Sequence, residues 1–277
     1  MKMKGKVLVI IALAMTAMGT SACGNAKNVE KDMDYGYGAN TYAIGKERTK
    51  KFGLSDFDAL EVEGFVKVHY TQGSKYSVKL VGDSKAIDVY KLKVEENTLH
   101  AEMKYNYSTR ENIGELNLYV TMPRLRNVEM SGATKFFAKD ISTSKLGIEG
   151  AAIMTIDRVT CEQLGIEMSG AAKVNVSAKA QDTDLDVSGA AIGSVSIDGG
   201  SLDADCSGAA KMNLTFKGTT ANIEGSGAAK VNAKVDCNTL NAEGSGAGKV
   251  TVSGKASYTN VEKSGAAMVD TSKLIRL

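Results

Sequence analysis

The stretch SGAAKVNVSAKAQDTDLDV, residues 169–187, is followed at once by SGAAIGSVSIDGGSLDADC, residues 188–206, which repeats its pattern. The same opening recurs through the second half of the chain, and the glycine of each copy marks the period. These glycines stand at positions 132, 150, 170, 189, 208, 227, 246 and 265. Five of the seven spacings are 19 residues, and the other two, 18 and 20, cancel. A fixed period of this length indicates a repeat architecture.

Each unit alternates apolar and polar residues, which is the pattern of a β-strand. Val174 and Val176 flank the polar Asn175 in the first quoted unit, a period of two residues rather than 3.6. About halfway along, the alternation slips by one residue, so that Leu185 and Val187 become the apolar positions. A slip of one residue turns the chain at a corner while apolar side chains stay on one side.

A coil of one turn per unit satisfies both the period and the strand pattern. Nineteen extended residues at about 3.3 Å each have a contour of roughly 60 Å, enough for one closed turn. We therefore predict an all-β fold, a right-handed parallel β-helix (solenoid) of about 19-residue turns with less regular N-terminal turns. The glycines then form a column at a corner that needs positive φ or close backbone approach. A narrow coil also explains a composition with a single Pro and no Trp.

The N-terminus carries the features of an export signal. Three lysines precede an apolar run over residues 7–18, which is too short to span a bilayer as a helix. The run ends in TSACG, residues 20–24, which resembles the lipobox of bacterial lipoproteins. We predict that Cys23 is acylated and becomes the first residue of the mature chain. The alternative is an ordinary secretory signal cleaved after Ala22.

The predicted organisation has three parts. A lipoprotein signal peptide covers 1–22, a flexible tether 23–52 and a single β-helix domain 53–277, divided into irregular turns at 53–131 and repeats at 132–277. The tether is rich in charge and lacks apolar periodicity. Alternating residues near positions 60, 68, 79, 93, 101 and 118 predict strands that cap the coil, and residues 273–277 predict a terminal strand or cap.

Stacked turns also fix the state of the three remaining cysteines. Cys161 and Cys237 each stand nine residues before a repeat glycine, so they share a column four turns apart. Cys206 belongs to another column. Because turns are about 4.8 Å apart, no pair meets the limit of about 7 Å between Cα atoms for a disulfide. We predict free, inward-facing thiols.

Acidic residues recur on the outer surface. Three residues before the glycine stands an acid in seven of the eight units: Glu129, Glu167, Asp186, Asp205, Glu224, Glu243 and Glu262. We call this row the acid column. Two of its members form a tetrad on adjacent turns with the acids two residues before them: Asp184, Asp186, Asp203 and Asp205. Hard cations prefer such oxygen ligands, so a weak Ca²⁺ site is one hypothesis, and a salt-screened, solvated face is the alternative. We predict no other cofactor.

A row of lysines stands three residues after the glycine. Its members, which we call the lysine column, are Lys135, Lys173, Lys211, Lys230 and Lys249. Mutual screening with the acids across the corner is the simplest interpretation. The functional alternative is a docking stripe for an anionic glycan or lipopolysaccharide.

The balance of charge argues against nucleic-acid binding, and the lack of histidine in the repeats argues against a catalytic serine there. With 34 Lys and Arg against 32 Asp and Glu, the chain lacks the basic footprint that nucleic-acid binding requires. The repeats contain no His that could activate the serine beside each glycine, and His69 and His100 stand in strand contexts where we expect structural roles. We expect the serine hydroxyls to hydrogen-bond the corner instead.

The segment from Ser55 onward resembles a known family. SDFDALEVEGFVKVHY at residues 55–70 and LYVTMPRLRNVEMSGA at residues 118–133 are similar to the opening of the auto-transporter adhesin, head GIN domain family of bacterial envelope lipoproteins. The resemblance implies a β-helix and a role in adhesion, without catalytic residues.

Together these features predict a non-enzymatic lipoprotein, anchored by its lipid to a bacterial membrane in the cell envelope or at the surface. It would act as an adhesin-like, ligand-binding or spacer module, with a glycan or another surface ligand as partner and an oligomeric state left open. The alternative is a β-helix polysaccharide lyase or hydrolase. Such enzymes need long loop insertions and aromatic platforms, whereas these turns are nearly insertion-free and contain few aromatic residues.

Overall fold

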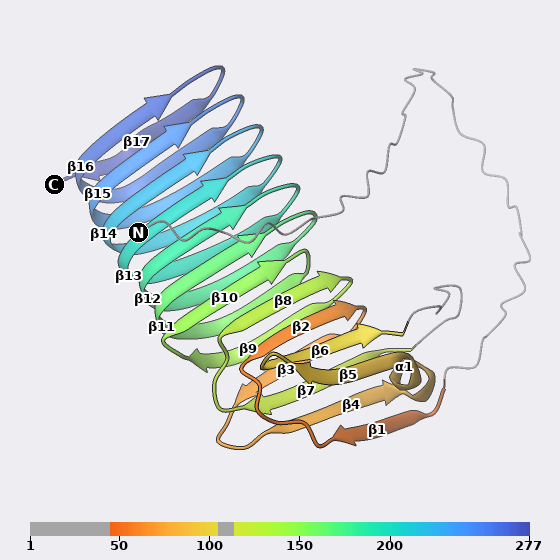
Figure 1. Cartoon of the computed structure of the whole chain (residues 1–277). Coiled ribbons are helices and arrows are strands. Elements are labelled where there is room, and N and C mark those ends of the chain that lie inside the picture. The colour runs from red at the N-terminus through yellow and green to blue at the C-terminus, as the bar shows by residue number, and fades with distance from the viewer. Residues whose placement is uncertain (1–44, 105–113) are drawn as a thin grey trace, which may run out of the picture. The chain divides into compact units, whose positions relative to one another are not determined.

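The computed structural model describes residues 45–104 and 114–277. These residues belong to one compact unit and contain one short helix and seventeen strands that join in a single sheet (Figure 1). The expected signal peptide, Cys23 and most of the expected tether lie outside the described residues. None of the described helices is long and apolar enough to cross a membrane.

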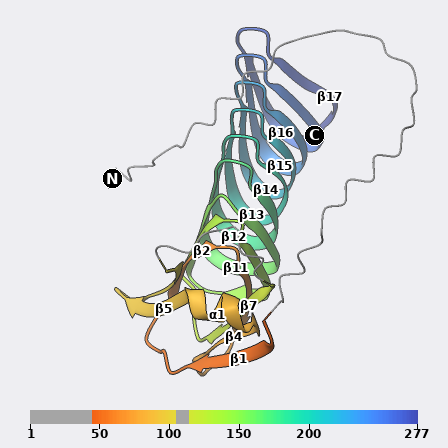
Figure 2. The ribbon, with the colours of Figure 1, turned by 90° about the vertical axis from the view of Figure 1, so that its right-hand side faces the viewer.

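Seven parallel strands form the regular part of the solenoid. They are β11 (Ile153–Met168), β12 (Lys173–Val187), β13 (Ile192–Cys206), β14 (Lys211–Gly225), β15 (Lys230–Gly244), β16 (Lys249–Lys263) and β17 (Met268–Arg276). Residues 19 apart are partners from β12 to β16, for example Val176 and Val195. The predicted β-solenoid with a 19-residue repeat is therefore confirmed. Figure 2 shows these turns stacked on one another.

Each long strand bends at its middle and contributes to two walls. The first half of β12 alternates buried and exposed residues, then Gln181 and Asp182 are both exposed, and the second half alternates in the opposite phase. The predicted slip is this bend. We call the sheet formed by the first halves the first wall and the sheet formed by the second halves the second wall. Their inward side chains, such as Val174 and Leu185, are fully buried and form the apolar core between the walls.

A tight SGAA corner joins the second wall to the next first wall. Gly189 has φ +74°, and a Cβ there would lie 2.7 Å from the carbonyl oxygen of Gly170, which explains the glycine column. The amide of Ala209 donates to the carbonyl of Gly189 at 2.7 Å. Most hydrogen bonds at the corners join backbone groups. For example, the carbonyl of Ser226 accepts from the amide of Ala229. The expectation that serine hydroxyls bond the corner is met only in part, by Ser188 Oγ, which donates to the carbonyl of Met168.

The irregular turns are stacked out of sequence order. Their strands are β2 (Ala59–Gly64), β3 (Lys67–Gln72), β6 (Thr98–Met103), β7 (Leu116–Met122), β8 (Asn127–Gly132), β9 (Lys135–Ser142) and β10 (Lys145–Gly150). β2 pairs with both β6 and β8, and β3 with both β7 and β9. The turn made by β2 and β3 therefore lies between two turns that follow it in sequence.

Antiparallel strands and a helix close this end of the solenoid. They are β1 (Glu47–Phe52), β4 (Ser77–Asp83), α1 (Ser84–Val89) and β5 (Tyr90–Glu95). β4 pairs antiparallel with both β1 and β7, so the end strand of the parallel stack is covered. β1 falls within the expected tether at 23–52, which moves the start of the β domain to before residue 53.

The thiols lie where the register prediction placed them. Strand register pairs Cys161 with Ala180, Ala180 with Gly199, and Gly218 with Cys237, while the neighbouring pair Asp198 and Lys217 keeps the same register between Gly199 and Gly218. The three cysteines within the described residues are free; Cys206 and Cys237 are buried and Cys161 is half-buried. Free, inward thiols are thus confirmed for the two buried residues, and the third lies at the margin of the core.

Candidate functional site: two charged columns

The acid column is a continuous ladder on the outer face of the second wall. Strand register makes Asp186 the partner of both Glu167 and Asp205, and the series continues through Glu224 to Glu262. The structure adds two members that the sequence count missed: Glu61 and Glu149.

The missing members have different causes. Glu149 pairs with Glu129 and Glu167, although it stands only one residue before its own glycine. The unequal spacings of 18 and 20 residues on the two sides of Gly150 are the sequence feature that could have revealed Glu149. This acid keeps its place in the ladder, whereas Gly150 is displaced from the regular position of the repeat glycine. Glu61 lies in an irregular turn, and no sequence period reaches it.

Burial and neighbouring carboxylates raise the pKa of four acids in this ladder, Glu129, Glu149, Asp205 and Glu224. Burial and then the neighbouring carboxylates of Glu61 and Glu149 raise the pKa of Glu129. In the same way, burial followed by the charges of Asp203 and Asp186 raises the pKa of Asp205. Like charges on adjacent rungs disfavour the ionised form. The ladder is therefore under electrostatic strain that a positively charged partner would relieve.

A groove runs along the acid column. Its larger part has a volume of about 780 Å³ and is lined by Glu149, Glu167, Asp184, Asp186 and Asp205, with Gly147 and Gly165 among the lining residues. A Cβ added at Gly165 would meet nothing within 4 Å, so the groove is open at this glycine. A smaller hollow of about 180 Å³ continues past Asp203 to Glu243.

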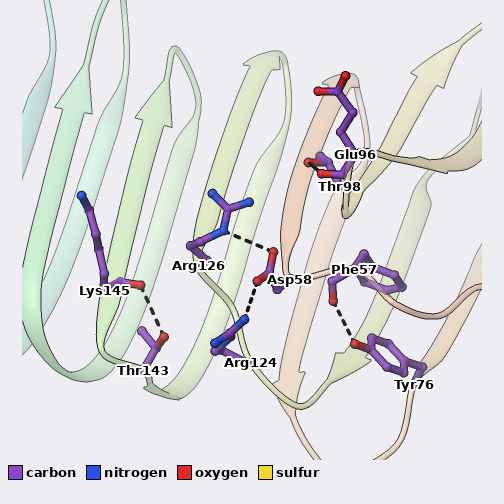
Figure 3. A network of polar contacts seen from close by, with 9 residues as sticks. All are labelled: Phe57, Asp58, Tyr76, Glu96, Thr98, Arg124, Arg126, Thr143 and Lys145. Carbon is purple, nitrogen blue, oxygen red and sulfur yellow. Dashed lines mark hydrogen bonds and ion pairs between the residues drawn. The ribbon is translucent and has the colours of Figure 1, made fainter. Parts of the chain in front are cut away.

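Basic residues mark the N-terminal end of this groove. Arg126 and Lys145 line it there and lie at the starts of β8 and β10. The Arg126 guanidinium donates to the Asp58 carboxylate at 3.2 Å, and Arg124 donates to the same carboxylate at 2.8 Å (Figure 3). This end of the groove is thus fixed by ion pairs, and its acidic part begins beyond it.

The calcium hypothesis finds no supporting geometry. Asp184 is the partner of Asp203 and Asp186 of Asp205 on adjacent strands, so the predicted tetrad is assembled as expected. Nevertheless, within residues 45–104 and 114–277 no three His, Cys, Asp or Glu side chains are arranged to hold a metal ion. The tetrad is part of the acidic groove.

The lysine column lies on the outer face of the first wall. Register places all five predicted lysines in one row, which is interrupted by Ile153 and Ile192 and ends at Met268. Ile192 is 51% exposed. Along the described strands none of the five lysines forms an ion pair. Mutual screening across the corner stays a prediction: the two columns lie on the outer faces of different walls, with no ion pair between them among the described residues.

A polar row accompanies the lysines on the first wall. It consists of Thr155, Asn175, Ser194, Asn213, Asn232 and Thr251, and Asn232 Nδ2 donates to Asn213 Oδ1 at 3.2 Å. Toward the N-terminus the row continues into stacked rings: His69 lies between Tyr119 at 4.8 Å and Phe137 at 5.5 Å. The first wall therefore presents the lysine column beside a row in which each turn contributes an amide or a hydroxyl group.

Both histidines take part in contacts that fix the irregular turns. Besides its stacking, His69 Nε2 lies 3.0 Å from Asn117 Oδ1. His100 Nδ1 lies 3.0 Å from the carboxylate of Glu61 at the end of the acid column. These contacts agree with the structural roles expected for the two residues.

Comparison with known proteins finds one matching family model and several solved structures of similar fold. A family model described as "Putative auto-transporter adhesin, head GIN domain" matches residues 56–215 and 195–276. A solved structure of a "putative adhesin" from Bacteroides fragilis has a TM-score of 0.61 and 16% identity, covering 82% of this chain and 97% of that chain. One from Parabacteroides distasonis has a TM-score of 0.62 and 16% identity, covering 81% and 97%. A third, from Parabacteroides merdae, has a TM-score of 0.57 and 18% identity, covering 81% and 96%. No curated protein matches.

Proposed function

This chain belongs to the "Putative auto-transporter adhesin, head GIN domain" family, and on that premise we propose that it is a non-enzymatic, adhesin-like module of the cell envelope. Its solenoid presents a repeating surface to an anionic glycan, and a lipid on Cys23 holds it at the membrane. The proposal assigns ligand binding to the first wall and anchoring to the N-terminal segment.

The unpaired lysine column is the observation that supports glycan binding. None of its lysines forms an ion pair with a carboxylate among the described residues, and adjacent turns are about 4.8 Å apart. The polar row beside it offers amides and hydroxyls to sugar hydroxyls. A linear anionic polysaccharide, such as the charged part of a lipopolysaccharide, matches an extended, repeating surface better than a compact ligand does.

Binding of the chain from Gly24 onward to immobilised glycans tests this proposal. We expect anionic polysaccharides to bind and neutral ones to bind weakly, with affinity that falls as salt rises. The triple variant K211Q/K230Q/K249Q should bind at least tenfold more weakly. The matched control is K179Q/K217Q/K255Q, which removes the same number of charges from another exposed row of the first wall. Equal loss in both variants, or no glycan binding, would favour a spacer role.

Anchoring is tested separately in cells. The full chain should incorporate labelled fatty acid and sediment with membranes, whereas Cys23→Ser should do neither. A Cys23→Ser variant that remains lipid-labelled would show that the anchor lies elsewhere. Lipid on Cys23 is supported by its small neighbours Ser21 and Ala22 and the apolar run before them.

A further inference from the structure

We infer that copies of this chain associate side by side, with the lysine column of one copy in the acidic groove of the next. The occupant of the groove is thus a second copy of the chain. The inference goes beyond glycan binding and does not depend on it, although both use the lysine column.

The position of the two columns around the corner supports this arrangement. The regular acids stand three residues before the glycine of the corner, and the lysines stand three residues after it. They therefore lie at similar distances from the same edge of the solenoid, on opposite walls facing opposite ways. A second copy displaced sideways, without rotation, brings its acid column opposite the lysine column of the first.

The two columns also have the same pitch. Each gains one residue per turn of the same coil, as Lys211, Lys230 and Lys249 do on one wall and Asp205, Glu224 and Glu243 on the other. Once one rung is matched, the two columns stay in step, although Ile153, Ile192 and Met268 stand in place of lysine on three rungs. A partner of another fold would have to share the strand spacing by coincidence, whereas a second copy shares it by construction.

Electrostatics favour the contact on both sides. Burial and then the charges of Asp205 and Glu243 raise the pKa of Glu224, so these acids lack compensation within the molecule. None of the lysines forms an ion pair among the described residues. Pairing the columns compensates both, and several pairs acting together are worth more than isolated surface ion pairs.

Shape complements the charge pattern. The acid column borders a groove of about 780 Å³ that is open at Gly165, and the lysine column is a ridge of long side chains. Ile192, 51% exposed, stands in this ridge between Lys173 and Lys211. Together with the methylene groups of the lysines it provides apolar surface that would leave water on contact.

This contact joins different faces of two identical molecules, so each copy keeps one face free. Association therefore extends into rows rather than closing as a dimer. Anchoring through Cys23, as proposed above, would hold all copies at one membrane and favour the parallel alignment that matched rungs need.

Sedimentation of the chain from Gly24 onward gives the first test. At about 20 mM salt, where screening is weak, we expect concentration-dependent association of the purified protein. At about 500 mM salt we expect monomers. A monomer at low salt and high protein concentration would overturn the inference, as would association that salt does not affect.

Charge reversal gives the decisive test. The variant K173E/K211E/K230E/K249E places four acids in the lysine column, and D186K/D205K/E224K/E243K places four lysines in the acid column. Each alone should remain monomeric at low salt, and their equimolar mixture should associate again. The control K179E/K217E/K255E should behave as the wild type. Circular dichroism verifies folding; if a reversed variant does not fold, K173Q/K211Q/K230Q/K249Q and D186N/D205N/E224Q/E243Q replace the pair, and each should weaken association at least tenfold.

The acid-side variants separate this inference from the proposed function. D186N/D205N/E224Q/E243Q retains every lysine, so it should lose self-association and still bind an anionic polysaccharide. If it still self-associates like the wild type, the inference is wrong whatever the glycan result. If it stops self-associating but neither it nor the wild type binds any glycan, only the glycan proposal fails.

Discussion

At the scale of single residues, the corner glycines determine how closely successive turns can approach. Gly208 has φ +67°, and a Cβ there would lie 2.8 Å from the carbonyl oxygen of Gly189. Both the backbone conformation and the space therefore exclude a side chain. The positive φ recurs at all the corner glycines from Gly132 to Gly265, and Gly189 meets the carbonyl of Gly170 in the same way.

Gly208→Ala should lower the free energy of unfolding by about 1–3 kcal/mol, because the left-handed conformation and the close carbonyl both oppose a methyl group. Urea denaturation measures the change. Gly165→Ala is the matched control: a Cβ there meets nothing within 4 Å and the backbone is extended. We expect it to be neutral or slightly stabilising. Equal destabilisation by both substitutions would contradict this explanation of the glycine column.

The reactivity of each cysteine thiol is a second property that depends on the surroundings of a single residue. Burial raises the pKa of Cys161 to about 11 and, together with the charge of Asp205, that of Cys206 to about 12. Because the thiolate is the reactive form, neither should be alkylated by iodoacetamide at pH 8 in the folded protein. Both should react once the chain is unfolded in urea. Mass spectrometry counts the modified cysteines, and stoichiometric labelling of folded protein would contradict the placement.

At the scale of elements, the acid column makes the second wall sensitive to pH. The folded-state pKa of Asp205 and Glu224 is raised, so folding favours their protonated forms. Their contribution to stability is full below the unfolded-state pKa and is lost as the pH rises through the folded-state value. At neutral pH these carboxylates therefore oppose the pairing of neighbouring turns.

Replacing Asp205 by Asn and Glu224 by Gln should raise the free energy of unfolding at pH 7 by a few tenths of a kcal/mol per site. The gain should vanish as the pH falls below about 4, where the wild-type acids are protonated as well. Denaturation at several pH values in high salt, where rows do not form, measures it. Asp198→Asn, on the first wall between Lys179 and Lys217, should not stabilise the protein.

The N-terminus of helix α1 depends on one buried carboxylate. Asp83 is 5% exposed and accepts from the amides of Lys85 at 2.7 Å, Gly45 at 2.8 Å and Gly114 at 3.3 Å. Burial alone would raise its pKa, but these backbone hydrogen bonds outweigh it and hold the pKa of Asp83 below its usual value. One side chain thus joins α1 to the segments that lead into β1 and β7.

Asp83→Ala should lower the free energy of unfolding by about 1–3 kcal/mol, because buried amides lose their acceptor. Part of the wild-type advantage should disappear as the pH falls through the lowered pKa. Asp88→Ala, which removes an exposed ion pair with Arg48, should change stability little. A small effect of Asp83→Ala in thermal denaturation would contradict its role as a cap.

At the scale of the whole molecule, the solenoid behaves as a stack in which each turn contacts mainly its neighbours. Deleting residues 208–226, one full period, joins two equivalent corner positions. The shortened chain should keep its β-sheet circular dichroism and unfold cooperatively. Deleting residues 208–216, about half a turn, should abolish folding because it breaks the register of every later strand. Folding of both deletions would contradict the register shown by the strand partners.

Sequence and structure agree most closely where the period is regular. The pairing of Asp184 with Asp203 and the four-turn separation of Cys161 and Cys237 both follow from counting residues, since one period equals one turn. Where the period breaks, the prediction of the acid column was incomplete. Glu149 was missed because the repeat glycines on either side of Gly150 stand 18 and 20 residues from it. For the lysines and acids, counting gives the residues between the two columns but not the side toward which each wall faces.

The sequence by itself determined the repeating coil, its columns and its free thiols, because a hydrophobic period of two within a unit of 19 leaves one way to bury the apolar side chains. Only the tertiary structure decided the order of the first turns, where β2 and β3 lie between strands that follow them. It also decided that the charged columns face opposite ways. These features depend on contacts between segments far apart in the chain, which leave no periodic trace in the sequence.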